Sequence, residues 1–152
     1  MRPTHLYPHP QKEPCHEHRR NPGARHHHPH RRHGCPELAA RYIAAWNATD
    51  GAQRDHLVRS TFSSDVQYRD PMMEGQGHDG LAALIAGAQQ RFAGHRFTLL
   101  GTPEGHHDVV RFSWALAADG AEPVARGTDM AEVDAHGRLR KVTGFLDYVA
   151  GA

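Results

Sequence analysis

Asp70 is the residue whose setting in this sequence most clearly suggests chemistry. It ends an alternating run with Val66 and Tyr68, so its carboxyl group shares a predicted strand face with apolar side chains. A carboxylate on an inward face is costly unless it is paired, hydrogen-bonded or used. Pro71 should end the strand, which places Asp70 where a strand opens into a loop. The alternative is a turn aspartate that bonds the backbone after Pro71.

A second carboxyl group, that of Asp129, falls on a predicted strand face of small apolar residues. The other members of that face are Ala125, Gly127, Ala131 and Val133. Burial among them should raise the pKa of Asp129 and favour its neutral, donating form. The alternative is a buried ion pair with an arginine such as Arg111 or Arg126. Two carboxyl groups in different environments are what acid–base chemistry requires.

Aromatic residues are expected around these carboxyl groups. Tyr42 and Trp46 stand four residues apart in a helical pattern, so both side chains can face one cavity. Tyr42 is a candidate for catalysis, with a core tyrosine whose hydroxyl is satisfied as the alternative. The residues expected to line a substrate pocket are Trp46, Tyr68, Phe112, Trp114 and Phe145. Most of them would also serve the hydrophobic core.

Two histidines near the expected pocket are weaker candidates. His107 stands at the start of a predicted strand, where we favour an exposed hairpin histidine over a pocket role. His78 lies in a glycine-rich loop. No side chains in the body have metal-ligand spacing, and no glycine-rich phosphate loop precedes a helix. We therefore expect neither a metal nor another cofactor.

The elements that must position these residues form two groups along the chain. Apolar residues recur with helical periodicity as far as residue 92, and from residue 95 the period is close to two. We expect helices over about 36–50, 51–62 and 79–92, a loop at the glycines of 75–80, and strands near 66–70, 96–104, 107–117, 122–134 and 138–148. The predicted class is α+β, with three helices on one face of a curved, mostly antiparallel sheet. Such a sheet leaves a cone-shaped cavity, a natural ligand site.

The first 36 residues differ from the rest in composition. They hold nine of the fifteen histidines, seven of the ten prolines and a net charge of +5, against −4 for residues 37–152. Such a segment buries too little apolar surface to fold, so we expect residues 1–36 to be disordered and residues 37–150 to form one domain. Its histidines can bind a transition metal, but their spacing matches no structural zinc motif. A translation start near Glu37 is a further possibility.

Charge and hydropathy exclude several classes of partner. The body lacks the clustered basic residues that nucleic-acid binding needs. No apolar run approaches the roughly 18–20 residues of a membrane span, and the basic N-terminal residues lack the apolar stretch that is typical of a signal peptide. Both cysteines precede residue 37, so the body needs no internal disulfide, in keeping with a cytoplasmic location.

Several strings resemble the nuclear transport factor 2-like superfamily, and within it the SnoaL-like group. They are RYIAAWNATD in the first helix, YRDPMMEGQGHDG at the first strand, and RFSWAL, GTDM and VTGFLD in the later strands. The match covers about residues 37–148. It implies a cone-shaped fold of three N-terminal helices on a curved sheet. Members include steroid isomerases, polyketide cyclases, epoxide hydrolases, dehydratases and non-catalytic binders.

Three positions are similar to those of the ketosteroid isomerases in particular. The resemblance assigns Asp70 as the general base that shuttles a proton beside a carbonyl. It assigns Tyr42 and a protonated Asp129 as the groups that hold the dienolate oxygen. The implied ligand is a small apolar carbonyl compound, steroid- or polyketide-like. An isomerase or cyclase without cofactor is therefore the leading hypothesis.

Other functions within the superfamily remain open. Epoxide hydrolases have an arginine and an aspartate two apart on one strand, whereas Arg126 and Asp129 are three apart, so that pattern fails. A polyketide cyclase would pair an aspartate base with a nearby histidine. The competing class is a non-catalytic ligand-binding or dimerisation module. The outer face of the sheet would support a homodimer.

Overall fold

The computed structural model describes residues 34–152, and the structural statements below concern this part of the chain. The expected disorder of the N-terminal segment and the metal-binding capacity of its histidines fall on residues 1–33, outside the described residues. The folded part begins with helix α1 at Cys35, so residues 35 and 36 belong to the first turn of a helix.

Three helices carry the first layer of the fold. Helix α1 (Cys35–Asn47) has a proline in its first turn, where the missing N–H is not needed, and it buries one face from Leu38 to Trp46. Helix α2 (Gly51–Thr61) starts where the side chain of Asp50 accepts a hydrogen bond from the backbone N–H of Gln53. Helix α3 spans Gly77–Arg91.

One six-stranded sheet forms the second layer. Its strands are β1 (Phe62–Arg69), β2 (Glu74–Gln76), β3 (His95–His106), β4 (Val109–Ala118), β5 (Ala125–Val133) and β6 (Leu139–Val149). They lie in the order β2-β1-β6-β5-β4-β3. Only β1 and β6 pair in parallel, and all other neighbours are antiparallel. The sheet thus joins the two halves of the chain through the pairing of β1 with β6.

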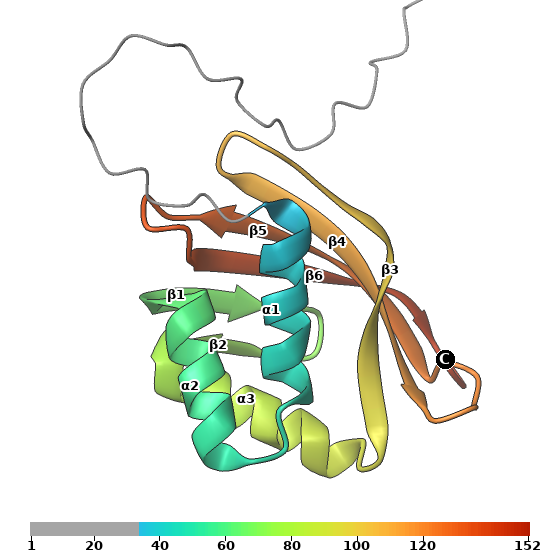
Figure 1. Ribbon diagram of the computed structural model, residues 1–152. Helices are drawn as coiled ribbons and strands as arrows, with labels where there is room; N and C mark the ends of the chain where they lie inside the picture. Colours follow the sequence, from blue (N-terminus) through green and yellow to red (C-terminus); the bar gives the residue numbers. More distant parts are fainter. Residues whose placement is uncertain (1–33) are drawn as a thin grey trace, which may run out of the picture.

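The helices cover one face of the sheet, and the long strands curve around α1 (Figure 1). Irregular pairing between β3 and β4 and between β5 and β6 accompanies this curvature, as β-bulges do in bent sheets. The expected α+β class, with three helices on a curved and mostly antiparallel sheet, is confirmed. No helix among residues 34–152 is long and apolar enough to cross a membrane.

Two local features differ from the expectations. The glycine-rich loop contains a short strand, β2, whose Gly75 pairs with Tyr68. Helix α2 ends at Thr61, and Phe62 opens β1 rather than closing the helix. Both differences have the same cause: Phe62 pairs with Leu139 on β6, and the end of β1 pairs with β2, and local periodicity does not reveal such partners.

The core lies between α1 and the concave face of the sheet. Alternation along β5 buries Ala125, Gly127, Asp129 and Ala131 and turns the residues between them outward. The buried face of α1 packs on these inward residues, with Tyr42 and Trp46 in the same core cluster as Phe112 and Val142. The concave face under α1 is therefore where a buried site must be sought.

Candidate functional site

Four polar side chains meet under α1 and form what we call the carboxyl–tyrosine cluster: Tyr42, Tyr68, Asp70 and Asp129. The Tyr42 hydroxyl on α1 donates to Asp129 Oδ2 on β5 over 2.5 Å. The Tyr68 hydroxyl on β1 donates to Asp70 Oδ2, just beyond the same strand, over 2.7 Å. Each carboxyl group thus has its own tyrosine: Tyr68 and Asp70 are close in sequence, whereas Tyr42 and Asp129 are far apart.

The sheet register explains why the two carboxyl groups approach each other. Asp129 pairs with Gly144 on β6, and Thr143 pairs with Arg69, the residue before Asp70. A Cβ atom built on Gly144 would lie 2.9 Å from Asp129 Oδ1 and 3.0 Å from Asp70 Cβ. Gly144 therefore leaves a small space between the side chains of Asp129 and Asp70, which a larger residue would fill.

Asp129 is nearly inaccessible, with 1% of its surface exposed. Burial raises the pKa of Asp129 to about 6, and the charge of Asp70 adds to the rise, whereas the hydrogen bond from Tyr42 and the nearby indole N–H of Trp114 oppose it. Its Oδ1 atom has no hydrogen-bond partner. Within residues 34–152 no lysine or arginine pairs with it, because Arg111 instead pairs with Glu104 and Arg126 lies over the ring of Tyr148. The alternative of a buried ion pair is thus not supported.

Asp70 takes the turn position that was the alternative expectation, and it also accepts a hydrogen bond from Tyr68. Its Oδ1 atom accepts backbone N–H groups from Met72 at 2.7 Å and Met73 at 2.9 Å, which is the turn after Pro71. Its Oδ2 atom points the other way and accepts from Tyr68. The turn therefore fixes the carboxylate in one orientation while its second oxygen stays with the cluster. Asp70 is only half-buried, so it is more accessible to water than Asp129.

The two tyrosines remain protonated donors. Burial first, and then the negative charge of Asp129, raise the pKa of both Tyr42 and Tyr68 above its usual value. The charge of Asp129 acts on Tyr68 as well as on its direct partner Tyr42. The four groups therefore form one electrostatic unit rather than two isolated pairs.

Four of the five expected aromatic residues lie on the concave side. The Tyr42 ring contacts Phe112 at 4.8 Å and Trp46 at 6.1 Å between centroids. Trp46 contacts Tyr68 at 5.4 Å, and the half-buried Trp114 lies over Gly127, where a Cβ atom would come within 2.3 Å of its ring. These rings surround the cluster with apolar surface.

Phe145 does not join these rings, and its expected place in the pocket is corrected. It is 52% exposed and lies on the outer face of the sheet. The reason is the strand alternation of β6, where the neighbouring Gly144 faces inward. The sequence predicts an inward Phe145 from its aromatic character, but it does not reveal whether Phe145 or Gly144 points toward the helices.

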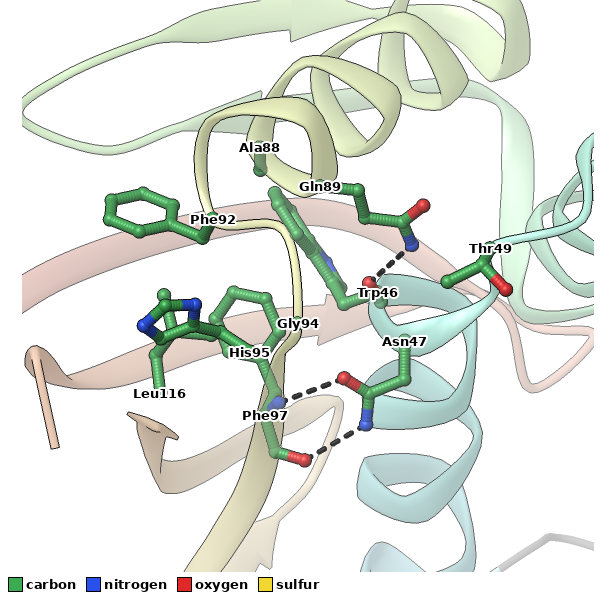
Figure 2. A pocket seen from close by; sticks show the side chains of 10 residues that line it. All are labelled: Trp46, Asn47, Thr49, Ala88, Gln89, Phe92, Gly94, His95, Phe97 and Leu116. Atoms are coloured by element: carbon green, nitrogen blue, oxygen red, sulfur yellow. Dashed lines mark hydrogen bonds between the residues drawn. The ribbon is translucent and has the colours of Figure 1, made fainter. Parts of the chain in front are cut away.

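A small cavity lies beside the cluster, where the ends of α1 and α3 meet the start of β3 (Figure 2). We call it the helix-end cavity. Its lining consists of Trp46, Asn47, Thr49, Ala88, Gln89, Phe92, Gly94, His95, Phe97 and Leu116. Trp46 is the one residue shared with the expected pocket, and no member of the carboxyl–tyrosine cluster lines this cavity. The cluster and the helix-end cavity are thus adjacent but separate.

The histidines have positions outside the cluster. His107 is exposed in the turn between β3 and β4, with a positive φ of 52°, and its ring contacts His106. The favoured prediction of an exposed hairpin histidine agrees with this position. The His78 ring is hydrogen-bonded to the carbonyl oxygen of Phe62 at 2.9 Å, which ties the start of α3 to β1.

Comparison with known proteins assigns most of the chain to one family. Residues 39–142 match the SnoaL-like domain family. The chain belongs to the SnoaL-like family. The structure of a proposed SnoaL-like isomerase from Agrobacterium tumefaciens is 45% identical, with a TM-score of 0.71 over 73% of this chain and 95% of that chain. No protein with a curated description matches the sequence.

More distant structures share the fold of this SnoaL-like protein. An NTF2-like protein of unknown function from Exiguobacterium sp. 255-15 is 24% identical, with a TM-score of 0.59 over 72% of this chain and 98% of that chain. A proposed ketosteroid isomerase from Kribbella flavida is 17% identical, with a TM-score of 0.57 over 78% and 81% of the two chains. These likenesses support the cone-shaped nuclear transport factor 2-like fold that the resemblance implied.

Two features of this SnoaL-like site escaped the sequence reasoning. Tyr68 was expected only as apolar lining, whereas its hydroxyl holds Asp70. Gly144 was not considered, although it separates the two carboxyl groups. A glycine inside the predicted strand VTGFLD was the available signal, because glycine in a strand often marks a close approach of other groups.

Proposed function

We propose that this protein binds a small apolar carbonyl compound and moves a proton beside the carbonyl group, as a cofactor-independent isomerase or cyclase. The observation that carries this proposal is the pair of carboxyl groups on either side of Gly144, each held by its own tyrosine. One is deeply buried and the other is half-buried, so they suit different protonation roles. The isomerase description of the Agrobacterium tumefaciens relative is in keeping with the proposal.

Asp70 is the proposed base. Its carboxylate takes a proton from the carbon beside the carbonyl, and the C–H electron pair moves to give a dienolate with its charge on oxygen. Asp70 then returns the proton to another carbon of the same dienolate, so the isomerisation needs no other reactant. The turn at Met72 and Met73 keeps the carboxylate oriented through both steps.

Tyr42 and Asp129 are the proposed partners of the carbonyl oxygen. When Asp129 is ionised, it accepts the hydroxyl hydrogen of Tyr42, which is then unavailable to a ligand. When Asp129 is protonated, it can donate in turn, and the Tyr42 hydrogen is free for the carbonyl. Since burial raises the pKa of Asp129 to about 6, carbonyl binding should strengthen as the pH falls through this value.

The direct test is turnover of a 3-keto-Δ5 steroid, followed by the ultraviolet absorbance of the conjugated enone product. Asp70→Asn should lower kcat about a hundredfold or more, because a positioned general base contributes that much. The matched control is Asp134→Asn. Asp134 also accepts two backbone N–H groups in a turn, from His136 and Arg138, and lies outside the cluster.

The control separates a catalytic role from a turn role. If both variants lose activity equally, the turn geometry explains the effect and Asp70 is not the base. If turnover is absent in the unmodified protein while a bicyclic or steroid ketone binds, the isomerase proposal fails and the binding proposal stands.

A non-catalytic ligand-binding module is the second candidate. One observation favours it: the turn already occupies one oxygen of Asp70, which leaves this carboxylate less free to act as a base. Saturable binding of steroid ketones without any chemical change would support this function. Calorimetric titration with a saturated analogue of the steroid distinguishes binding from turnover.

We further propose that two copies associate through the outer face of the sheet. Large apolar side chains are exposed there, including Met130 at 44% and Phe145 at 52%. Phe145→Glu should then convert a dimer to a monomer in analytical ultracentrifugation. Exposed Met72→Glu, in the loop after β1, is the matched control and should leave the assembly state unchanged. A monomeric unmodified protein would contradict this proposal.

A further inference from the structure

Trp46 occupies the boundary between the helix-end cavity and the carboxyl–tyrosine cluster. It lines the cavity at the end of α1, with its indole directed toward Ala88 of α3 (Figure 2). Its ring centroid also lies 6.1 Å from that of Tyr42 and 5.4 Å from that of Tyr68. Because neither tyrosine lines the cavity, the indole forms the wall between the two regions.

The helix-end cavity offers little chemistry of its own. Asn47 exchanges two hydrogen bonds with the backbone of Phe97, and the Gln89 amide donates to the carbonyl oxygen of Trp46 (Figure 2). The same amide also donates to the carbonyl oxygen of Ala48. A volume of about 40 Å³ corresponds to roughly one or two water molecules. A ligand with two fused rings therefore needs a side chain to move before it can approach the cluster from this side.

Trp46 lines the helix-end cavity and has a buried polar group, its indole N–H, that makes no hydrogen bond. It is only 4% exposed. A buried donor without an acceptor is unfavourable, and a tryptophan N–H normally finds one. Phe97 and Leu116, the neighbouring apolar walls, carry no such side-chain group. The closed position of the indole therefore has a cost that the apolar walls do not have, and an indole that moves aside can donate to water instead.

We propose that Trp46 determines which ligands reach the carboxyl–tyrosine cluster. Its indole closes the route from the helix-end cavity in this structure, and it turns aside for a fused-ring ketone whose oxygen continues to Tyr42. The selected ligand class is thus a rigid apolar ring system with a hydrogen-bond acceptor. This inference rests on the proposed function for the identity of the binding groups, but it does not require turnover.

The first experiment measures binding of 2-decalone, a bicyclic ketone, by isothermal titration calorimetry. Trp46→Ala should tighten binding about tenfold, because the variant no longer needs a sparsely populated open state. The matched control is Phe92→Ala, which removes another aromatic wall of the same cavity that has no ring contact with Tyr42 or Tyr68. Its affinity for 2-decalone should stay within about twofold of the unmodified protein.

A double variant excludes simple filling of the hole left by the indole. If the ketone oxygen reaches the cluster, Tyr42→Phe in the Trp46→Ala background should remove most of the gain in affinity. A gain that survives Tyr42→Phe, or an equal gain in Phe92→Ala, overturns the proposal. No steroid turnover in any variant, with the binding pattern intact, would refute the proposed catalysis alone.

A second measurement keeps the full side chain of Trp46. The chain has two tryptophans, so Trp114→Phe leaves Trp46 as the sole indole fluorophore. Saturating 2-decalone should increase the quenching of its fluorescence by acrylamide and shift the emission to longer wavelength, since the displaced indole meets solvent. Unchanged quenching in a protein that binds the ketone would show that Trp46 stays in place and would overturn the proposal.

Discussion

The carboxyl–tyrosine cluster and the helix-end cavity are neighbours with opposite polar character. Around the cavity, Asn47 and Gln89 are neutral amides that bond backbone atoms of other elements, and the Gln89 side-chain oxygen also accepts from Arg54. In the cluster, two ionisable carboxyl groups border one space, and Asp129 keeps an oxygen without a partner. Burial raises the pKa of Asp129 in the cluster, so we assign the amides a structural role and the cluster the chemical one.

The difference predicts opposite responses to removal of a polar group. Removal of an amide side chain whose hydrogen bonds are all made should destabilise the fold at every pH. A buried carboxyl group that has no cation beside it should instead destabilise the fold when it is ionised. Its replacement by a neutral side chain should therefore stabilise the fold. The predictions below test this contrast, beginning with the largest effect.

Asp129→Asn should raise the free energy of unfolding at pH 8. The pKa of Asp129 is about 6 in the folded protein against an ordinary value of 3.8. Ionising Asp129 therefore costs the folded state about 3 kcal/mol of stability. Because the folded-state pKa is the higher one, the original protein has this stability in full below pH 3.8, where Asp129 is protonated, and loses it as the pH rises through about 6. The advantage of Asp129→Asn should therefore grow between these pH values and then level off.

Urea unfolding at several pH values measures this advantage. The control is Phe112→Leu, on the residue that pairs with Asp129 across β4 and β5, because it alters packing without removing a charge. Its effect on the free energy of unfolding should not vary with pH. An Asp129→Asn variant that is less stable than the original protein at pH 8 would contradict the claim that the charge is uncompensated.

Gln89→Ala should destabilise the fold by about 2 kcal/mol, because the carbonyl oxygen of Trp46 loses its side-chain donor and Arg54 loses an acceptor, although Arg54 still donates to the carbonyl oxygen of Ala48. The loss should be independent of pH between 5 and about 8, since no titrating group is removed. The neighbouring exposed Gln90→Ala is the control and should be close to neutral. Thermal unfolding of both variants gives the answer. Equal effects would show that the amide bonds add nothing.

The sequence predicted the cluster better than the cavity. Alternation along β5 and the proline after Asp70 were enough to place Asp129 and Asp70 on the inner side, because both signals are local. The side of Phe145, the strand β2 and the role of Gly144 depend on register between strands, which a single sequence does not contain. The cavity depends on how α1 and α3 meet β3, and helical periodicity does not set that angle.

Gly144→Ala should cost about 1 to 2 kcal/mol of stability and block the space between the carboxyl groups. The added methyl group would meet Asp129 Oδ1 at 2.9 Å, closer than side chains normally pack. Gly87→Ala in α3 is the matched control, since a Cβ atom there meets nothing within 4 Å and alanine favours helices. Ketone binding that is unaffected by Gly144→Ala would show that the ligand does not use this space.

Tyr68→Phe should have the smallest effect on stability, about 1 kcal/mol, because it removes one hydrogen bond and keeps the ring against Trp46. Its effect on catalysis should be clearer. Without the hydroxyl, Asp70 Oδ2 loses the donor that holds it toward the cluster, so kcat should fall about tenfold while KM changes little. Tyr148→Phe, on the exposed outer face, is the control. If Tyr68→Phe raised KM and left kcat unchanged, the hydroxyl would act in ligand binding rather than in positioning the base. Only one of the two carboxyl–tyrosine pairs would then have a chemical role.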